Sequence, residues 1–137
     1  MIDEIIAETE IAIRQETDVV VASQQGRALA ACLGMSPSSQ TAVTIAIAEI
    51  ARNIVWYAWH GQITLQAVRQ GDRQGIVVRA TDAGPGISDV GRAMQDGYST
   101  GRGLGLGLPG ARRLMDEFEI VSEVGKGTLV TMKKWKA

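Results

Sequence analysis

Gly101-Arg-Gly-Leu-Gly-Leu-Gly-Leu-Pro-Gly110 is the stretch of the chain that decides the fold assignment. Glycine occupies five of its ten positions, and Ala-Arg-Arg-Leu-Met-Asp-Glu-Phe118 follows directly, so we expect a helix over about 108–118. A glycine-rich loop that opens into a helix lets backbone N–H groups approach an anion closely, and the helix N-terminus adds partial positive charge. The pattern therefore predicts a phosphate-binding loop, with a mobile linker as the alternative interpretation.

The composition is that of an ordinary globular protein and argues against several functional classes. The 137 residues suit one compact domain, so we expect a single domain over 1–137. A net charge of -1 argues against nucleic-acid binding through a broad basic surface. The chain start lacks a signal-peptide pattern and no apolar run reaches roughly 18 residues, so we expect a cytoplasmic protein with no membrane contact. The single cysteine, Cys32, has apolar neighbours and is expected to be buried.

Hydrophobic periodicity and turn residues predict helices grouped before and after a set of hairpin-connected strands. Asp18 is expected to be the N-cap of a helix over 19–33 that Gly34 ends, and Ser36-Pro37 to begin a helix that runs to about residue 57 or 59. This grouping predicts an α+β two-layer sandwich, with helices on one face of a mixed, mostly antiparallel sheet. The other expected elements are a short helix at 87–95 and strands at 5–13, 62–69, 75–81, 119–124 and 127–135.

The long helix after Pro37 carries a second motif. Between residues 41 and 58 its only strongly polar side chains are Glu49, Arg52 and Asn53, which fall within a narrow arc. The other positions are mostly apolar, so we expect a buried helix in which a charged side chain needs a partner. Two interpretations stay open: Glu49 pairs with Arg52 three residues on, or Glu49 orients a hydroxyl while Asn53 offers an amide oxygen to Mg²⁺.

The third motif, Asp82-Ala-Gly-Pro-Gly86, follows the apolar strand expected at 75–81. The Asp82 carboxylate can accept a hydrogen bond from an exocyclic amine such as that of adenine. Gly84 and Gly86 allow the backbone to approach a flat ring closely. Taken singly, the segment is better explained as a β-turn. Taken with the other two motifs, it indicates a nucleotide site.

These motifs resemble those of a known superfamily. Glu-x-x-x-Asn on a helix, Asp-x-Gly-x-Gly, and Gly-Leu-Gly-Leu-Gly-Leu occur here in the order found in the GHKL ATPases, which include gyrase-type enzymes and histidine kinases. Gly125-Lys-Gly-Thr128 matches a further element of that pattern. The resemblance implies the Bergerat ATP-binding fold, with ATP and Mg²⁺ as cofactors.

A lone domain of this size resembles the anti-sigma-factor serine kinases of bacterial partner-switching systems, and most of all the stressosome serine/threonine kinases. The resemblance implies an ATP-dependent protein serine/threonine kinase that phosphorylates STAS-domain scaffold or antagonist proteins and, once released, activates a serine phosphatase. The alternatives are a nucleotide-gated anti-sigma factor with little or no kinase activity, and an ATP-hydrolysing fragment of a histidine kinase. The similar stretches are 48–54, 82–87, 96–100 and 107–118.

The same resemblance implies a role for each motif residue. Asn53 would coordinate Mg²⁺, Glu49 would polarise the acceptor hydroxyl, and Asp82 would bind the adenine amine. Phosphoryl transfer also needs positive charge near the transferred group, for which Arg102 is the candidate, with a solvated side chain as the alternative. Arg52 is assigned to holding Glu49 or to a partner surface. The remaining nucleotide contacts are Gly84, Gly86, Ile87 and Thr128 near the base, and the backbone of Gly103, Leu104, Gly105, Leu106, Gly107 and Leu108 at the phosphates.

Overall fold

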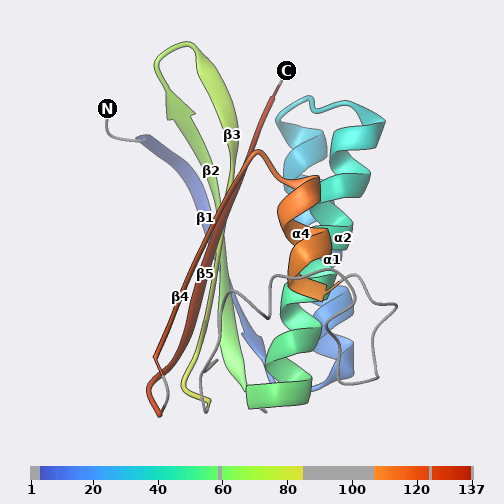
Figure 1. Cartoon of the computed structure of the whole chain (residues 1–137). Coiled ribbons are helices and arrows are strands. Elements are labelled where there is room, and N and C mark those ends of the chain that lie inside the picture. The colour runs from blue at the N-terminus through green and yellow to red at the C-terminus, as the bar shows by residue number, and fades with distance from the viewer. Residues whose placement is uncertain (1–3, 59, 85–106, 124, 137) are drawn as a thin grey trace.

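The computed structural model describes residues 4–58, 60–84, 107–123 and 125–136. In this part of the chain five strands form one sheet, and the helices lie together on one of its faces (Figure 1). The expected α+β two-layer architecture is therefore confirmed. We expected a mixed, mostly antiparallel sheet, and every strand pairing in the described residues is antiparallel.

The sheet has the strand order β1-β2-β3-β5-β4, with β1 and β4 at its edges. Strands β2 and β3 are joined by the turn at Gly71-Asp72, where Gly71 has a φ of 61° that favours glycine. Alternate residues of each strand point to the helices, because side chains in a strand alternate between the two faces. The strands are β1 (Glu4–Ile13), β2 (Gly61–Gln70), β3 (Arg73–Asp82), β4 (Glu117–Glu123) and β5 (Gly127–Trp135).

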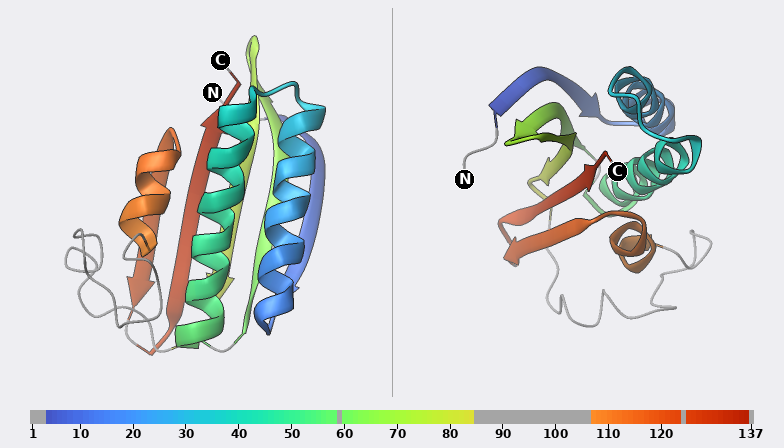
Figure 2. Two further views of the ribbon diagram at one scale, coloured as in Figure 1. Left: turned by 90° about the vertical axis from the view of Figure 1, so that its right-hand side faces the viewer. Right: turned by 90° about the horizontal axis from the view of Figure 1, so that it is seen from above.

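Three helices, α1, α2 and α4, lie side by side over the sheet, with α2 between the other two (Figure 2). The expected start of α2 is confirmed: the Ser36 hydroxyl accepts the Ser39 N–H at 3.2 Å, and Pro37 occupies the first turn. Gly34, with a φ of 78°, follows the end of α1, as expected. The helical elements are α1 (Glu16–Cys32), α2 (Pro37–Asn53), the π-helical turn η1 (Ile54–Ala58) and α4 (Gly107–Leu114).

The prediction that Asp18 is the N-cap of the first helix was wrong. The N-cap is Gln15, and the Asp18 carboxylate accepts the backbone N–H groups of Arg14 at 2.9 Å and Gln15 at 3.2 Å. A carboxylate three residues into a helix can reach back to the N-cap in this way, so the helix begins earlier than the aspartate itself suggests.

Two other predictions were wrong, and a third concerns residues outside the described part of the chain. The helix expected to end at residue 118 ends at Leu114, because Glu117 and Phe118 pair with β5 as the start of β4. Cys32 is exposed, not buried, since it lies on the solvent side at the end of α1. The short helix expected at 87–95 lies outside the described residues.

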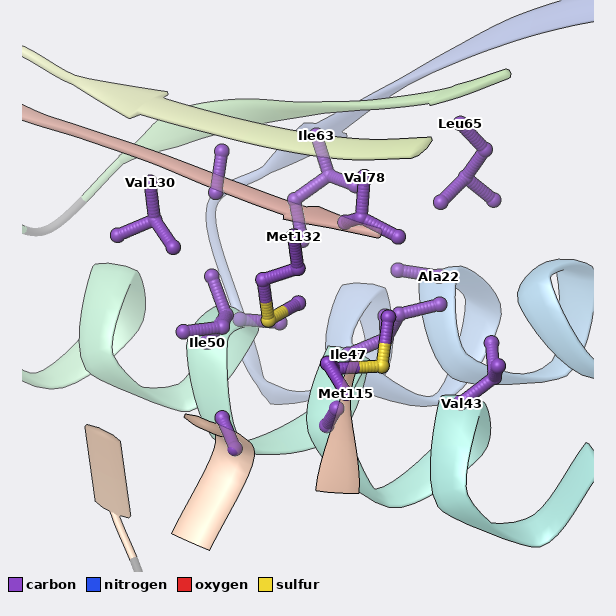
Figure 3. Close-up of a cluster of buried hydrophobic side chains, with 14 of the residues drawn as sticks. Ala22, Val43, Ile47, Ile50, Ile63, Leu65, Val78, Met115, Val130 and Met132 are labelled. Atoms are coloured by element: carbon purple, nitrogen blue, oxygen red, sulfur yellow. The ribbon is translucent and has the colours of Figure 1, made fainter. Parts of the chain in front are cut away.

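The hydrophobic core lies between the sheet and the helices (Figure 3). Val43, Ile47 and Ile50 of α2 pack against inward-facing residues of the central strands. Helix α1 approaches α2 closely at Gly26, where an added Cβ would lie 2.1 Å from the Ile47 Cδ1 atom. The strand residues of this cluster include Ile63, Leu65, Val78, Val130 and Met132. In the described part of the chain, no helix has the length and apolar character needed to span a membrane.

The position of α2 can be tested with two isoleucines on the same helix. Ile47 is fully buried, whereas Ile45 has an exposed fraction of 37%. We expect Ile47→Ala to lower the free energy of unfolding by about 2–5 kcal/mol, because it leaves a cavity in the core. Ile45→Ala is the matched control and should cost less than about 1 kcal/mol. Equilibrium urea denaturation measures both, and equal losses would contradict this arrangement of the helix.

Candidate functional site

The described residues of the helix motif and the Asp82 motif lie at one end of the sheet, where α2 ends (Figure 1). Asn53 is the last residue of α2, and Asp82 is the last residue of β3. Gly61, the first residue of β2, pairs with Asp82. A Cβ added to Gly61 would lie 2.9 Å from the Ile54 Cγ2 atom and 3.1 Å from the Asp82 Cβ atom. The end of α2 and the end of β3 are therefore packed against the same point of the backbone.

A row of three polar side chains crosses this end of the sheet. Asp82 of β3 pairs with Thr128 of β5, and Thr128 pairs with Ser122 of β4. Two residues away on these strands lie Ala80, Val130 and Ile120, which belong to the core or pack against it. Because side chains two apart share a face, the row points to the helix side of the sheet. The apolar inner face thus ends in three half-buried side chains that carry oxygen atoms.

Hydrogen bonds fix the members of this row. The Ser122 and Thr128 hydroxyl oxygens are 2.9 Å apart, and the Ser122 hydroxyl donates to the Gly127 carbonyl at 3.2 Å. The Asp82 Oδ1 atom accepts the Gly84 N–H at 2.9 Å. We expected Asp82 and Thr128 at the site but not Ser122. The alternation Phe118, Ile120, Ser122 carried the signal, since Ser122 is the polar member of an otherwise apolar series.

The backbone that follows Asp82 lies between two other segments. A Cβ added to Gly84 would lie 2.6 Å from the Ala58 Cβ atom and 2.8 Å from the Ala58 Cα atom, in η1. On β5, Gly127 has a φ of 99°, and an added Cβ there would lie 2.0 Å from the Asp82 carbonyl oxygen. Glycine at both positions permits this close approach. The sequence predicted a helix to about residue 57 or 59, but the α-helix ends at Asn53 and residues 54–58 form a π-helical turn. Such turns are frequent at functional sites.

Glu49 lies in α2 one turn before Asn53, and its side chain is only 8% exposed. The Arg52 Nη1 atom donates to the Glu49 Oε1 atom at 2.7 Å, and the Arg52 side chain is 37% exposed. The structure therefore contains the ion pair that was one of the two interpretations of this motif. This ion pair is compatible with the other interpretation, in which Glu49 orients a hydroxyl and Asn53 ligates Mg²⁺, because Glu49 and Asn53 lie on the same helix face.

Helix α4 begins at Gly107, the last part of the glycine-rich stretch. The Leu108 and Ala111 side chains belong to the core, so the first turn of α4 is anchored beside α2. In a helix the first N–H groups have no acceptor within the helix, and here these include Gly107 and Leu108. Pro109, buried in the same turn, has no N–H to leave unpaired. The other expected contacts, Gly86, Ile87, Arg102, Gly103, Leu104, Gly105 and Leu106, lie outside the described residues.

The donor set at this end of the sheet fits a purine nucleotide with Mg²⁺. Asp82 supplies an acceptor for an exocyclic amine, and Thr128 supplies a hydroxyl beside it. Asn53 supplies an amide oxygen, and Mg²⁺ commonly combines one or two such protein ligands with phosphate oxygens and water. The N-terminus of α4 adds N–H groups and partial positive charge suited to phosphate.

Comparison with known proteins shows the family to which the chain belongs. The sequence matches the model of the histidine kinase-like ATPase domain over residues 13–134. It is 46% identical over 125 residues to the serine/threonine-protein kinase RsbT of Bacillus subtilis (strain 168). This match covers 91% of this chain and 94% of that protein. It is also 33% identical over 99 residues to the anti-sigma F factor of Thermoanaerobacter sp. (strain X514), with 68% of each chain covered.

Among solved structures, the mycobacterial sensor histidine kinase MprB has a similar fold. The TM-score is 0.55, and the match covers 95% of this chain and 98% of that one. The sequences are 14% identical, so this likeness bears on the fold alone.

The close packing of Gly84 against η1 generates a stability prediction. We expect Gly84→Ala to lower the free energy of unfolding by about 1–3 kcal/mol, because the new methyl group would overlap Ala58 and force the backbone apart. Ala83→Ser, at the exposed neighbouring position, is the control and should leave stability nearly unchanged. Urea denaturation of the nucleotide-free chain measures both changes. Wild-type stability of Gly84→Ala would show that β3 does not end against η1.

Proposed function

The chain belongs to the family of histidine kinase-like ATPase domains, and we propose that it is an ATP-dependent protein serine/threonine kinase of a bacterial partner-switching system. One observation carries the proposal: Asn53, with Glu49 one turn before it, ends α2 at the same end of the sheet at which Asp82 ends β3. The 46% identity to a serine/threonine-protein kinase over most of both chains supports the same activity. We further propose that residues 1–137 form one such domain.

The row on the sheet would bind the base. Asp82 would accept the adenine amine, and its bond from the Gly84 N–H would hold the carboxylate in place for this contact. Thr128 would join the hydrogen bonds beside the base, and Ser122 would orient the Thr128 hydroxyl. Gly84 would border the ring. Gly86 and Ile87 stay predicted contacts on this side.

The end of α2 would face the phosphates. The Asn53 amide oxygen would ligate Mg²⁺, and the Glu49 carboxylate would orient the acceptor hydroxyl and take its proton. Bound Mg-ATP supplies the phosphoryl group and part of the charge neutralisation that transfer requires. The N–H groups of Gly107 and Leu108 lie at the α4 N-terminus, where phosphate oxygens are stabilised. Arg102 and the backbone of 103–106 stay predicted contributors.

The acceptors that we propose are STAS-domain proteins, as scaffold or antagonist of the signalling system. Phosphorylation would release the kinase, which would then activate a serine phosphatase. The support for these partners is the motif resemblance at 48–54, 82–87 and 107–118, together with the similarity to one relative named a serine/threonine-protein kinase and to others named anti-sigma F factors. A protein of this kind would act in the cytoplasm.

A second function is favoured by a separate observation. The 33% identity to an anti-sigma F factor over two thirds of the chain is consistent with a protein that sequesters a sigma factor when nucleotide is bound and transfers little phosphate. The identity to the kinase is higher and covers more of the chain, so the kinase is the first proposal.

Intact-mass analysis of a STAS-domain protein incubated with this chain and Mg-ATP tests the kinase activity. We expect the acceptor to gain one phosphate. Glu49→Gln should slow transfer by about 100-fold or more, because the hydroxyl loses its general base. Asn53→Asp should also slow phosphate transfer, because a charged carboxylate replaces the neutral amide at the proposed Mg²⁺ position. Glu119→Gln, at an exposed position on β4, is the matched control and should transfer phosphate at the wild-type rate.

The outcomes of this experiment separate the two functions. Unchanged transfer by Glu49→Gln would contradict the proposed role of that residue. No transfer despite measurable ATP binding, together with capture of a sigma factor, would favour the nucleotide-gated anti-sigma factor. Steady ATP hydrolysis without any protein acceptor would favour a hydrolase instead.

If the row of Asp82, Thr128 and Ser122 binds the base, substitutions in this row should lower the affinity for nucleotide. Asp82→Asn should weaken ATP binding by about tenfold or more and reduce the preference for ATP over GTP, because the one remaining oxygen would stay bonded to the Gly84 N–H and an NH2 donor would then face the adenine amine. Ser122→Ala should weaken ATP binding by about fivefold, the equivalent of one hydrogen bond. Thr131→Ala, on the same strand as Thr128 but on the opposite face, is the control. Isothermal titration with ATP and with GTP measures all three variants, and equal ATP affinity for Asp82→Asn and wild type would contradict the assignment.

A further inference from the structure

The ion pair between Arg52 and Glu49 has a more buried carboxylate than the pairs Arg69–Glu4, Lys126–Glu123 and Lys134–Asp116. Arg69 and Glu4 lie at 2.6 Å, but their side chains are 48% and 63% exposed. In the Arg52–Glu49 pair the carboxylate is 8% exposed and the guanidinium 37% exposed, at 2.7 Å. A surface ion pair contributes little to stability, whereas a nearly buried carboxylate needs a charged partner to offset its loss of water.

The helix geometry gives the two residues different positions. Glu49 and Asn53 are four apart, so they lie on one face of α2, above the end of the sheet. At about 100° per residue, Arg52 lies about 60° to one side of Glu49. Its guanidinium reaches back one turn and bonds the Oε1 atom of the carboxylate. A half-exposed cation on the flank of the site thus holds a buried acid within it.

This bond restricts the movement of the acid. A glutamate side chain has several rotatable bonds, and a general base must lie within hydrogen-bond reach of the proton that it accepts. Bonding of Oε1 to Arg52 fixes the carboxylate and leaves Oε2 as the oxygen for an incoming hydroxyl. A hydroxyl on a docked protein arrives at one place, whereas water can approach a carboxylate in many orientations. A fixed carboxylate therefore favours the protein hydroxyl.

We propose that Arg52 is a positioning residue, which holds Glu49 so that the phosphoryl group passes to a protein hydroxyl in preference to water. This inference rests on the proposed kinase function. In the step, the acceptor oxygen bonds to the γ-phosphorus, and the bond from the γ-phosphorus to the bridging oxygen breaks, so that ADP leaves. The hydroxyl proton passes to the Glu49 carboxylate and later to solvent.

Kinetics of Arg52→Gln and Arg52→Lys with a STAS-domain acceptor test the proposal. Arg52→Gln should lower kcat for transfer by about tenfold or more, as a misplaced reacting group does, and should leave KM for ATP unchanged. The ratio of phosphate transferred to phosphate released in water should fall. Arg52→Lys should restore part of kcat and part of the product ratio, because an ammonium group can still bond one carboxylate oxygen. Arg69→Gln removes an equally short ion pair from the sheet edge and is the matched control.

A double-mutant cycle shows whether Arg52 acts through Glu49. In the Glu49→Gln background, Arg52→Gln should cause no further loss of transfer, because the group that it positions is already changed. The nucleotide-free chain provides a second readout. Arg52→Gln should lower the urea midpoint of unfolding when Glu49 is present, and should have much less effect together with Glu49→Gln.

Three results would overturn the inference, and they are distinguishable. Wild-type kcat and wild-type product ratio for Arg52→Gln, with transfer lost in Glu49→Gln, would overturn the role of Arg52 and leave the kinase function standing. A raised KM for the acceptor with unchanged kcat would place Arg52 on the partner surface instead. No transfer by the unmodified chain would overturn the kinase function, and this inference with it.

Discussion

The site depends on the close packing of the backbone after β3 between two segments that are distant in sequence. Gly84 lies against Ala58 of η1, and the Asp82 carbonyl lies against Gly127 of β5. Both contacts leave no room for a Cβ atom, so the end of α2 and the start of β5 are held at a fixed distance from Asp82. The end of α2, which carries Asn53, therefore lies at the same end of the sheet as the polar row. A protein interior is closely packed and transmits such constraints over several residues.

The main features of this arrangement could be predicted from the sequence. Long runs with clear periodicity gave the correct type for each helix and strand that the structure describes, and the grouping of those elements predicted the two layers. Ser36-Pro37 marked the start of α2 because an N-cap hydroxyl and a first-turn proline act locally. Asn53, Asp82 and Thr128 were predicted from the sequence because each stands in a short motif with a chemical reason for its residue type. The order of these motifs then indicated that they belong together.

Other features depend on contacts that a sequence pattern does not contain. The first helix starts at Glu16 because Asp18 bonds backwards to the N-cap, and the residue type alone does not show the direction of that bond. The π-helical form of η1 is not part of the periodicity, nor is the packing of its Ala58 against Gly84, which lies 26 positions away in the printed sequence. Ser122 was recognisable as the polar member of an apolar series, but its pairing with Thr128 depends on the register of β4 with β5.

Glu49 shows why a structural and a functional interpretation of one residue need not compete. An acid in a buried helix must have a partner, and Arg52 is that partner. The same bond orients the carboxylate, and orientation is what a general base requires. Replacement of the pair by apolar side chains would fill the space at least as stably, since buried ion pairs often contribute little net stability. The ion pair that satisfies the buried acid in α2 is therefore compatible with the proposed role of the same carboxylate as a general base.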